Sequence, residues 1–509
     1  FINITLFILY KYQVKEILVF LKIDQMKAIF ILAITLSLAL GQNEFQTTIA
    51  QGVTITQQEW RFNQILDHLH PQSQDVIWQQ RFCTFSQYWN PLNGTVFISI
   101  GGESQMKGIS PGRGWLVQLA QTYNALVISL EHRFYGVSQP FPQSDTVDSF
   151  STQNLKYLTH DQALADTAYF ISQVKKNLFA DNSFKVSEMN PFITVGGSYP
   201  GALSAWFRYK YPHLTVGALA SSAVVNAIED FWQYDNQIYV STLKSGQQCP
   251  QNIQSFIQSI QDEVSNPNTQ AALLKQFQSE KLSVDEFLFF IPDNLASFVQ
   301  YGQRTDLCNI FNTADYATQK ANLIGYWTQN NNFPNATIYS QNFLNSPKKT
   351  QDSDNMRQWL YQYCSYFGWL QTPSQQAGQA MRSSTNSISF FEGQCTQAFG
   401  PIYVPKPDEV NGFYGGLNLL ATNIIFTNGS EDPWQWASLT KSKNGMIAIV
   451  SDCDNCAHGV ELSYPKASDS QALQNTRTTI QQNFDKWISD FRAQYVFSYV
   501  QSQLKKINQ

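Results

Sequence analysis

The sequence predicts an α/β protein, in which parallel strands alternate with helices and a helical cap is inserted between the strands of one sheet. Three observations predict it. Short runs rich in β-branched residues occur in the first half of the chain, as is typical of parallel strands buried on both faces. A long stretch with helical spacing follows, and two strand-like runs then return near the C-terminus. A single sheet that carries a cap domain would produce this order.

Length and composition limit the classes of protein. The 509 residues suit one large domain with an insertion, or two to three ordinary domains. Hydrophobic residues make up 43% of the chain, enough for a sizeable core. Charged residues make up 14%, and the net charge is −5, so no basic surface favours nucleic acid as a partner.

The N-terminal region reads as a targeting segment. Met26-Lys27 precedes 13 uncharged, mostly apolar residues (28–40), and Gly41 follows, which is typical of a signal peptide over 26–41. As a helix the run would span about 20 Å, short of the ~30 Å core of a bilayer, which argues against a stable membrane anchor. Residues 1–25 are interpreted as an upstream leader outside the fold. The expected location is outside the cell or in the lysosomal or vacuolar lumen.

The first part of the sheet domain is expected over 45–240. TVFISI and FITV each run into a pair of glycines, and ALVISL runs into Glu131-His132-Arg133. Between ALVISL and FITV, residues 162–179 have apolar side chains at helical spacing and few helix breakers. They are predicted to form a crossover helix.

The helical cap is expected over 245–410, where apolar residues recur at three- and four-residue steps. IQSFIQSIQDEV, QAALLKQFQSEKL and MRQWLYQYCSYFGWL all look helical. The second part of the sheet domain is expected over 411–505. It contains the strand-like runs NIIFTNG and GMIAIVS and a last amphipathic helix near 476–497.

A nucleophile motif lies in the segment FITVGGSYPGALSAW, where a strand runs into Gly196-Gly197-Ser198 and a helix begins. A tight strand-to-helix turn of this kind presents a serine hydroxyl above the sheet and needs small neighbours. Pro200 stands where the usual pattern has glycine, and proline fits a first helical turn. The oxyanion donors expected are the amide of Tyr199 and the loop of Gly102 and Glu103. By itself, Gly-Gly-Ser could simply form a turn.

A serine nucleophile needs a base, and in the α/β-hydrolase fold the order along the chain is Ser, Asp, His. Of six histidines four precede Ser198, and His213 lies towards the end of the helix that the serine begins. His458, after the strand GMIAIVS, is left as the base. Asp432 follows the strand NIIFTNG, so both residues come just after strands, where open α/β sheets build their sites. The predicted triad is Ser198, Asp432 and His458, which needs no metal or cofactor.

Several segments carry a family resemblance. They include ISIGGE, SLEHRFYGVSQP, TVGGSYPGALSAWFRYKYPHLTVGALASSA, WLYQYCSYFGWLQT and FTNGSEDPW, from about residue 60 to 490. In these the chain resembles the prolyl-type serine carboxypeptidases, a family that includes lysosomal Pro-X carboxypeptidase, dipeptidyl peptidase II and thymus-specific serine protease. The resemblance implies an α/β-hydrolase domain whose helical insertion caps the site. It also implies exopeptidase activity on peptide substrates, favouring proline before the cleaved bond.

Alternatives stay open at this point. A lipase or esterase could use the same triad, and a catalytically inactive binding protein could keep the scaffold. Trp434 could form a wall for a proline ring, but a core tryptophan is equally compatible with the sequence. Glu131, His132 and Arg133 are expected to brace the sheet edge. Whether the enzyme trims the carboxyl or the amino terminus is left open, as is homodimerisation.

Cysteines and glycosylation motifs agree with export. Seven cysteines suit an oxidising compartment. Because each pair brackets a helical stretch of the insertion, Cys249 is expected to pair with Cys308 and Cys364 with Cys395. Cys453-Asp454-Asn455-Cys456 has no second CxxC to complete a zinc site. Asn93 and Asn335 begin Asn-x-Thr acceptors for glycosylation.

Overall fold

The computed structural model describes residues 45–50, 53–70, 76–177 and 184–507. The expected leader (1–25) and signal peptide (26–41) lie outside the described residues. Among the described helices, none combines the length and the apolar character that crossing a bilayer requires.

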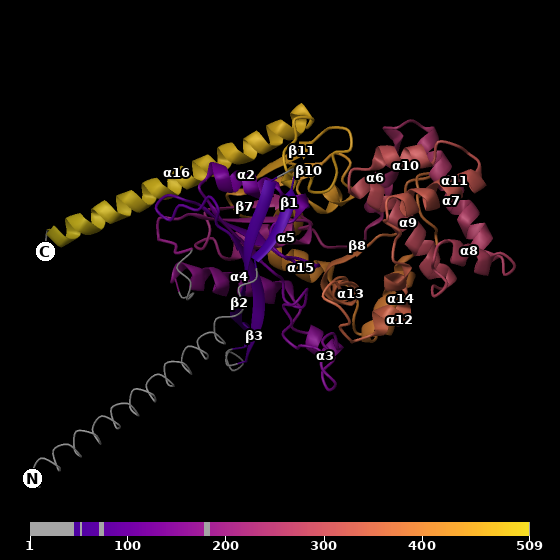
Figure 1. Cartoon of the computed structure of the whole chain (residues 1–509), viewed down its shortest axis with the longest axis horizontal. Helices are drawn as coiled ribbons and strands as arrows, with labels where there is room; N and C mark the ends of the chain where they lie inside the picture. Colours follow the sequence, from indigo (N-terminus) through magenta and orange to yellow (C-terminus); the bar gives the residue numbers. More distant parts are fainter. Residues whose placement is uncertain (1–44, 51–52, 71–75, 178–183, 508–509) are drawn as a thin grey trace, which may run out of the picture.

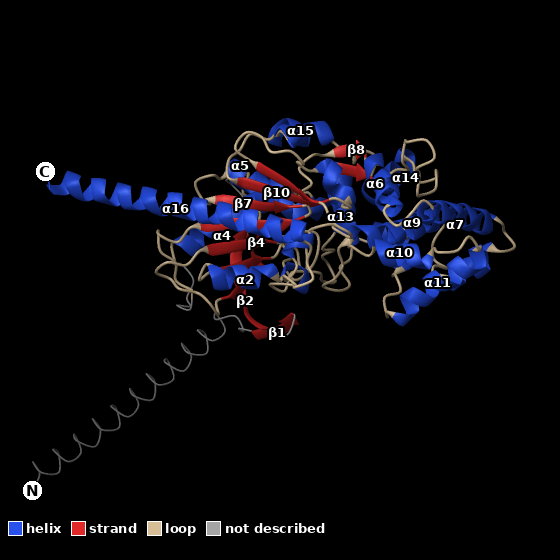
Figure 2. Cartoon of the chain, turned by 90° about the horizontal axis from the view of Figure 1, so that it is seen from above, coloured by secondary structure: helices blue, strands red, loops and turns tan. Residues whose placement is uncertain are grey.

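A nine-stranded sheet forms the centre of the molecule (Figure 2). Its strand order is β1-β2-β3-β5-β4-β6-β7-β10-β11. The strands from β5 to β11 run parallel, whereas β1, β2 and β3 pair antiparallel at one edge. This arrangement, with helices on both faces, is the α/β-hydrolase fold, so the predicted fold class is confirmed. The strands are β1 (Phe45–Ala50), β2 (Val53–Ile65), β3 (Ile77–Phe85), β4 (Val96–Ile100), β5 (Leu126–Leu130), β6 (Phe192–Gly197), β7 (Gly217–Ser221), β10 (Ile424–Gly429) and β11 (Ile447–Ser451).

The central strands are buried on both faces, as their unbroken apolar runs predict. Every residue of β4 and β5 is buried. Side chains alternate between the two faces of a strand, and in β4 Ile98 joins one apolar cluster while Phe97 joins the other. The first cluster is completed by α4 (His160–Lys175) and α5 (Tyr199–Lys210) and the second by α2 (Trp115–Thr122) and α16 (Gln471–Ile507).

Four strands of the sheet were not foreseen from the sequence. Strand β7 reads GALAS, small residues with little intrinsic preference for a strand. It is a strand because it is buried between β6 and β10, which supply its hydrogen-bond partners. The apolar residues of β1, β2 and β3 are interspersed with glutamine, so their sequences show no continuous apolar run. These segments are strands because they pair antiparallel with one another at the edge of the sheet.

The chain leaves the sheet after β7 and returns at β10. The helices between gather at one side of the molecule, except α15, which packs on α5 (Figure 1). Two corrections concern this insertion. The run Met356–Leu370 is not one helix, because α13 passes into a π-helical turn and then into a short strand, β9. Strand β9 pairs in parallel with β8, so the insertion is not wholly helical. The elements are β8 (Ile228–Asp230), α6 (Trp232–Leu243), α7 (Gln248–Ser265), α8 (Gln270–Gln276), α9 (Val284–Gln300), α10 (Arg304–Ile310), α11 (Tyr316–Gln329), α12 (Gln341–Asn345), α13 (Met356–Gln362), η4 (Tyr363–Phe367), β9 (Gly368–Leu370), α14 (Ile388–Phe399) and α15 (Pro407–Tyr414).

Other predicted helices differ at their ends. The crossover helix is α4, which ends at Lys175, and Phe179, where the prediction ended, lies outside the described residues. The last helix, α16, is longer than the predicted 476–497 and extends beyond the body of the molecule to the C-terminal end (Figure 1). Its N-terminal half packs on the sheet through Ile480, Phe484 and Trp487.

Disulfides hold the insertion together. The structure joins Cys249 to Cys308, which ties α7 to α10, and Cys364 to Cys395, which ties η4 to α14. These are the two pairs expected from the sequence. A third disulfide joins the cysteines at 453 and 456, and Cys83, on β3, is free and buried.

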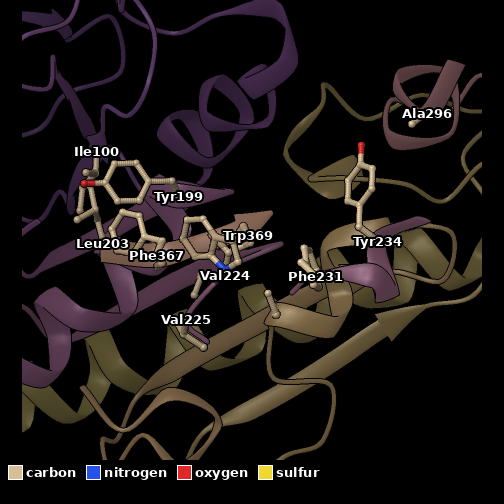
Figure 3. Close-up of a cluster of buried hydrophobic side chains, with 14 of the residues drawn as sticks. Ile100, Tyr199, Leu203, Val224, Val225, Phe231, Tyr234, Ala296, Phe367 and Trp369 are labelled. Atoms are coloured by element: carbon tan, nitrogen blue, oxygen red, sulfur yellow. The ribbon is translucent and has the colours of Figure 1, made fainter. Parts of the chain in front are cut away.

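A continuous apolar cluster attaches the insertion to the sheet domain (Figure 3). The ring of Tyr199, on α5, lies 5.5 Å from that of Phe367, and Phe367 stacks on Trp369 at 4.5 Å between ring centroids. Because these side chains are fully or almost fully buried, the cluster fixes the insertion in place above the carboxyl ends of the parallel strands.

Candidate active site

Ser198 stands at the turn between β6 and α5. Its backbone has φ 68° and ψ −134°, a strained conformation for a residue with a side chain, and its amide donates to the carbonyl of Ser221 at 2.9 Å. The turn is tight enough that a Cβ on Gly196 would overlap the carbonyl of Pro200, and one on Gly201 would lie 2.6 Å from the Ser221 oxygen. Glycine is therefore required on both sides of the serine.

Asp432 follows β10 and is fully buried. Its Oδ1 accepts a hydrogen bond from the Trp434 amide at 2.9 Å, which fixes the carboxylate. The two carboxylate oxygens lie 2.9 and 3.0 Å from Nδ1 of His458. The carboxylate therefore holds a proton on Nδ1 and leaves Nε2 of the imidazole free to act as a base.

His458 lies in the loop after β11, with an 8% exposed side chain. Its Nε2 is buried and has no hydrogen-bond partner among the described residues. Burial acts to lower the pKa of His458, but the charge and hydrogen bond of Asp432 outweigh it, helped by Glu103 and Glu461, and the pKa is raised. The backbone amide of His458 donates to the carbonyl of Gln300, the last residue of α9, at 3.0 Å.

The three predicted residues thus meet at the carboxyl edge of the sheet, after β6, β10 and β11. Asp432 and His458 are in direct contact, whereas Ser198 and His458 line the same pocket without a hydrogen bond between them. Contacts of this kind are often long in unliganded enzymes and tighten when substrate binds. The arrangement suits nucleophilic attack by a serine with a histidine base.

The pocket around Ser198 has a volume of about 510 Å³ and is lined by both aromatic and charged side chains. The aromatic ones include Trp359 and Trp369 from the insertion, whose rings stack at 6.0 Å, and Trp434 from the sheet domain. The charged ones include Glu103 and Arg113. Of these residues only Glu103 and Trp434 were singled out from the sequence. Trp359 and Trp369 lie within a segment that carried the family resemblance, which was the one available signal.

Trp434 lies between the pocket and the core. It lines the pocket, 6.3 Å from the imidazole of His458 and at right angles to Trp369, 6.1 Å away. It also packs against Phe231, 5.5 Å away in the core. Its indole Nε1 is buried without a partner among the described residues.

The residues expected as oxyanion donors lie beside the start of α5 or in the pocket of Ser198. Tyr199 begins α5, and the first amide of a helix has no carbonyl of its own helix to bind. Gly102 abuts that helix, because a Cβ there would overlap the ring of Pro200. The carboxyl of Glu103 enters the pocket, with Oε2 buried and without a partner among the described residues. Burial raises the pKa of Glu103 and outweighs the opposing charges of Arg113 and His458.

The Glu131-His132-Arg133 segment braces the sheet beside the site, as expected. Glu131 accepts from Arg81 at 2.5 Å and from the Ser138 hydroxyl at 2.7 Å. Arg133 makes two hydrogen bonds to Asp166, at 2.6 and 2.7 Å.

His132, the middle residue of that segment, supports the turn that carries Ser198. Its Nε2 lies 3.2 Å from the Tyr199 hydroxyl, which also accepts from Gln362 of α13 at 2.9 Å. Burial lowers the pKa of His132 to about 4, so its imidazole stays neutral.

A buried ionic clamp, which the sequence analysis did not identify, ties the insertion to the loop that carries His458. Arg304, on α10, donates to Glu431 at 2.8 Å and to Asp454 at 2.9 Å. Glu431 also accepts from the Asn455 amide at 2.9 Å. Glu431 precedes Asp432 in the sequence, but only the fold shows that an arginine 127 residues away neutralises it.

Comparisons with known proteins agree with this geometry. The family model described as serine carboxypeptidase S28 matches residues 64–480. The probable serine protease EDA2 of Arabidopsis thaliana is 34% identical over 457 residues, covering 86% of this chain and 90% of that protein. The thymus-specific serine protease of Homo sapiens is 28% identical, covering 88% and 92%. The lysosomal Pro-X carboxypeptidase of Bos taurus is 27% identical, covering 82% and 85%.

Proposed function

Since this chain belongs to the serine carboxypeptidase S28 family, and is therefore a serine peptidase, we propose that Ser198, Asp432 and His458 are its catalytic triad. The observation that carries the proposal is the pair of contacts between the buried Asp432 carboxylate and Nδ1 of His458, with Nε2 unpartnered in the pocket of Ser198.

In the acylation step, Nε2 of His458 takes the proton of the Ser198 hydroxyl as the oxygen attacks the carbonyl carbon of the peptide bond. Asp432 stabilises the imidazolium that forms. The carbon–nitrogen bond then breaks, and the imidazolium gives its proton to the leaving amine. The substrate's acyl group is left as an ester on Ser198.

In the deacylation step, His458 takes a proton from water, and the hydroxide attacks the ester. The ester bond breaks, the proton returns to the serine oxygen, and the peptide acid leaves. The amides of Tyr199 and Gly102, with that of Glu103, are the proposed donors to the oxygen that becomes negative in both steps.

A preference for proline before the cleaved bond is part of the proposal, supported by the aromatic side chains that line the pocket. The indoles of Trp359, Trp369 and Trp434 offer flat apolar walls of the kind that a pyrrolidine ring fits. One relative is named a Pro-X carboxypeptidase. Replacing Trp369 with alanine should therefore reduce kcat/KM more for peptides with proline at this position than for matched peptides with alanine.

Export is likewise proposed, to the cell exterior or to a lysosomal or vacuolar lumen. Support comes from the signal-peptide pattern of 26–41, from three disulfides and from a relative named lysosomal. Asn93 and Asn335 are both exposed and are the proposed glycosylation sites.

A fluorophosphonate probe tests the triad directly, because it reacts with an activated serine. The wild-type chain should be labelled at Ser198. Ser198→Ala should lose the labelling, and its turnover should fall by about 10⁴-fold or more, while the melting temperature stays unchanged. Labelling at another serine, or full activity of Ser198→Ala, would contradict the assignment. A peptide-library digest read by mass spectrometry at pH 5 and 7 then shows whether proline is preferred.

A further inference from the structure

A disulfide ends two residues before His458, in the loop that follows β11. Cys453 and Cys456 form it, with a sequence separation of 3. The amide of Cys456 donates to the carbonyl of Cys453 at 3.2 Å, which makes this loop a tight turn. Within the turn Asn455 has φ 56°, in the left-handed region that is uncommon for a residue with a side chain. The cross-link therefore helps to hold a backbone conformation that a free chain disfavours.

The buried end of this loop packs on the end of β10. The carbonyl of Cys456 accepts a hydrogen bond from the amide of Glu431 at 2.8 Å. A Cβ on Gly429 would lie 2.3 Å from the carbonyl oxygen of Cys456, so the two backbones are in contact. Glu431 directly precedes Asp432 in the chain. The contact between β10 and Cys456 therefore helps to set where the imidazole of His458 meets its acid.

The middle of the loop binds the insertion and the same glutamate. The amide of Asn455 donates to Glu431 at 2.9 Å. Its side-chain oxygen accepts from the amide of Thr305 at 3.3 Å, and its Nδ2 donates to the Thr305 hydroxyl at 3.1 Å. The carboxylate of Asp454 accepts from Arg304 at 2.9 Å. All of these contacts require residues 454 and 455 to stay in the turn that the disulfide closes.

This disulfide is also the one that a reductant in solution can reach. Of the described cysteines that form disulfides, Cys453 alone is not buried, and the side chains of its neighbours Asp452 and Asp454 are 82% and 85% exposed. The other two disulfides close loops with sequence separations of 59 and 31. A disulfide that closes a longer loop stabilises the fold more, and exposed disulfides are the labile ones. Mild reduction should therefore open the turn at 453–456 first.

We propose that the disulfide between Cys453 and Cys456 positions His458 for catalysis, and that its reduction by a dithiol lowers the activity reversibly. This inference rests on the proposed triad. Without the cross-link, Asn455 can leave the left-handed conformation and loosen its contacts with Glu431, so the imidazole is held less firmly. The enzyme is then fully active in the oxidising compartment expected of an exported chain, and less active where dithiols are in excess.

The reduction is a thiol–disulfide exchange. A thiolate of the dithiol attacks the sulfur of Cys453, the more exposed residue of the pair, and the sulfur of Cys456 leaves as a thiolate that takes up a proton. The second thiolate of the dithiol then attacks its own sulfur in the mixed disulfide. That step closes a disulfide within the reductant and releases the thiolate of Cys453, which is protonated in turn. Two electrons pass from the dithiol to the protein, and the oxidised dithiol reverses both steps.

The test places the native full-length enzyme at pH 7 in buffers with increasing ratios of reduced to oxidised dithiothreitol. The readout is the rate of fluorophosphonate labelling at Ser198, and alkylation of parallel samples with peptide mapping shows which cysteines are reduced. The labelling rate should fall by about 10- to 100-fold at the same midpoint potential at which thiols appear at Cys453 and Cys456. The other two disulfides and the far-UV circular dichroism should be unchanged at that midpoint, and oxidised dithiothreitol should restore the rate.

Two results of this titration would overturn the proposal. One is an unchanged labelling rate when the pair at 453 and 456 is fully reduced. The other is a rate that falls only when the buried disulfides are reduced or the circular dichroism is lost, because the effect would then come from unfolding.

Variants provide an independent arm. Cys453→Ser/Cys456→Ser should have the low labelling rate of the reduced wild type at every ratio of the buffer. Cys364→Ser/Cys395→Ser is the matched control, because it removes a disulfide between η4 and α14 and should keep the wild-type response to the buffer. A Cys453→Ser/Cys456→Ser enzyme as fast as the oxidised wild type would contradict the proposal. If this variant fails to fold, the titration of the wild type decides by itself.

Labelling of the oxidised wild type distinguishes the two levels of the argument. If Ser198 is labelled and the rate does not respond to reduction of the pair, the role of the disulfide is wrong and the triad stands. If the oxidised wild type is not labelled, the proposed function itself has failed.

Discussion

At the scale of single residues, the charges around His458 determine when this proposed base is neutral. The buried imidazole would by itself titrate below its ordinary range, but Asp432 reverses that direction, and Glu103 and Glu461 add to it. If His458 is the base, as proposed, it works only when neutral, so activity should fall as the pH decreases through its raised pKa. The midpoint of this acidic limb should lie above 6.5, the ordinary pKa of the group.

Glu103→Gln should shift this limb to lower pH, because removal of a nearby negative charge makes the imidazolium less stable. The measurement is the second-order rate of fluorophosphonate labelling against pH, which needs no peptide substrate. Glutamine keeps the backbone amide of residue 103 in place. Asp452→Asn is the control, since this carboxylate is 82% exposed and screened by solvent. An unchanged limb in Glu103→Gln would show that Glu103 carries no charge where His458 titrates.

At the scale of elements, the clamp between α10 and the loop of His458 couples the insertion to the active site. Glu431 is fully buried, so its charge depends on Arg304 for compensation. Arg304→Gln should reduce the free energy of unfolding by about 3–5 kcal/mol and lower kcat, because Glu431 would hold the Asn455 amide less firmly.

Lys244→Gln tests this interpretation, because Lys244 is 3.5 Å from the same carboxylate but one-third exposed. Its loss should cost less than about 1 kcal/mol. Thermal unfolding and steady-state kinetics of both variants provide the comparison. Equal effects of the two substitutions would contradict a specific role for the buried arginine.

The cysteines provide a second prediction at this scale. Alkylation of the native protein should leave Cys83 unmodified, because it is buried and burial raises the pKa of its thiol to about 12. After unfolding without reduction, Cys83 alone should react. Peptide mapping without reduction should recover Cys249 with Cys308 and Cys364 with Cys395, and removal of either pair should cost about 2–4 kcal/mol. Any other pairing would contradict the disulfides that join α7 to α10 and η4 to α14.

At the scale of the whole molecule, the proposed export predicts a glycosylated chain. Asn93 lies in the loop before β4 and Asn335 before the turn Ala336–Tyr339 of the insertion, and both are exposed. Treatment of the secreted protein with an N-glycosidase should lower its mass in two steps. Asn93→Gln and Asn335→Gln should each remove one step without loss of activity. A secreted chain whose mass is unchanged by the enzyme would contradict both sites.

The assembly of the whole fold explains what could be predicted and what could not. The strands β4, β5 and β6 were recognised because burial on both faces demands continuous apolar runs, which a sequence displays directly. Strand β7 was missed because Gly-Ala-Leu-Ala-Ser has little preference for any structure, and its neighbours impose the strand. The helix expected to reach Leu370 ends early because Gly368 adopts φ 73° and the chain then pairs with β8.

By itself the sequence determined the strand–turn–helix around Ser198 and the order of Ser, Asp and His, since both depend on local backbone geometry and on the direction of parallel strands. Only the tertiary structure decided that Asp432 contacts His458, that Arg304 neutralises Glu431, and that Arg113 lines the pocket of Ser198. Those contacts join residues far apart in the chain, and their energy depends on burial and on mutual distance, which no local pattern of residues encodes.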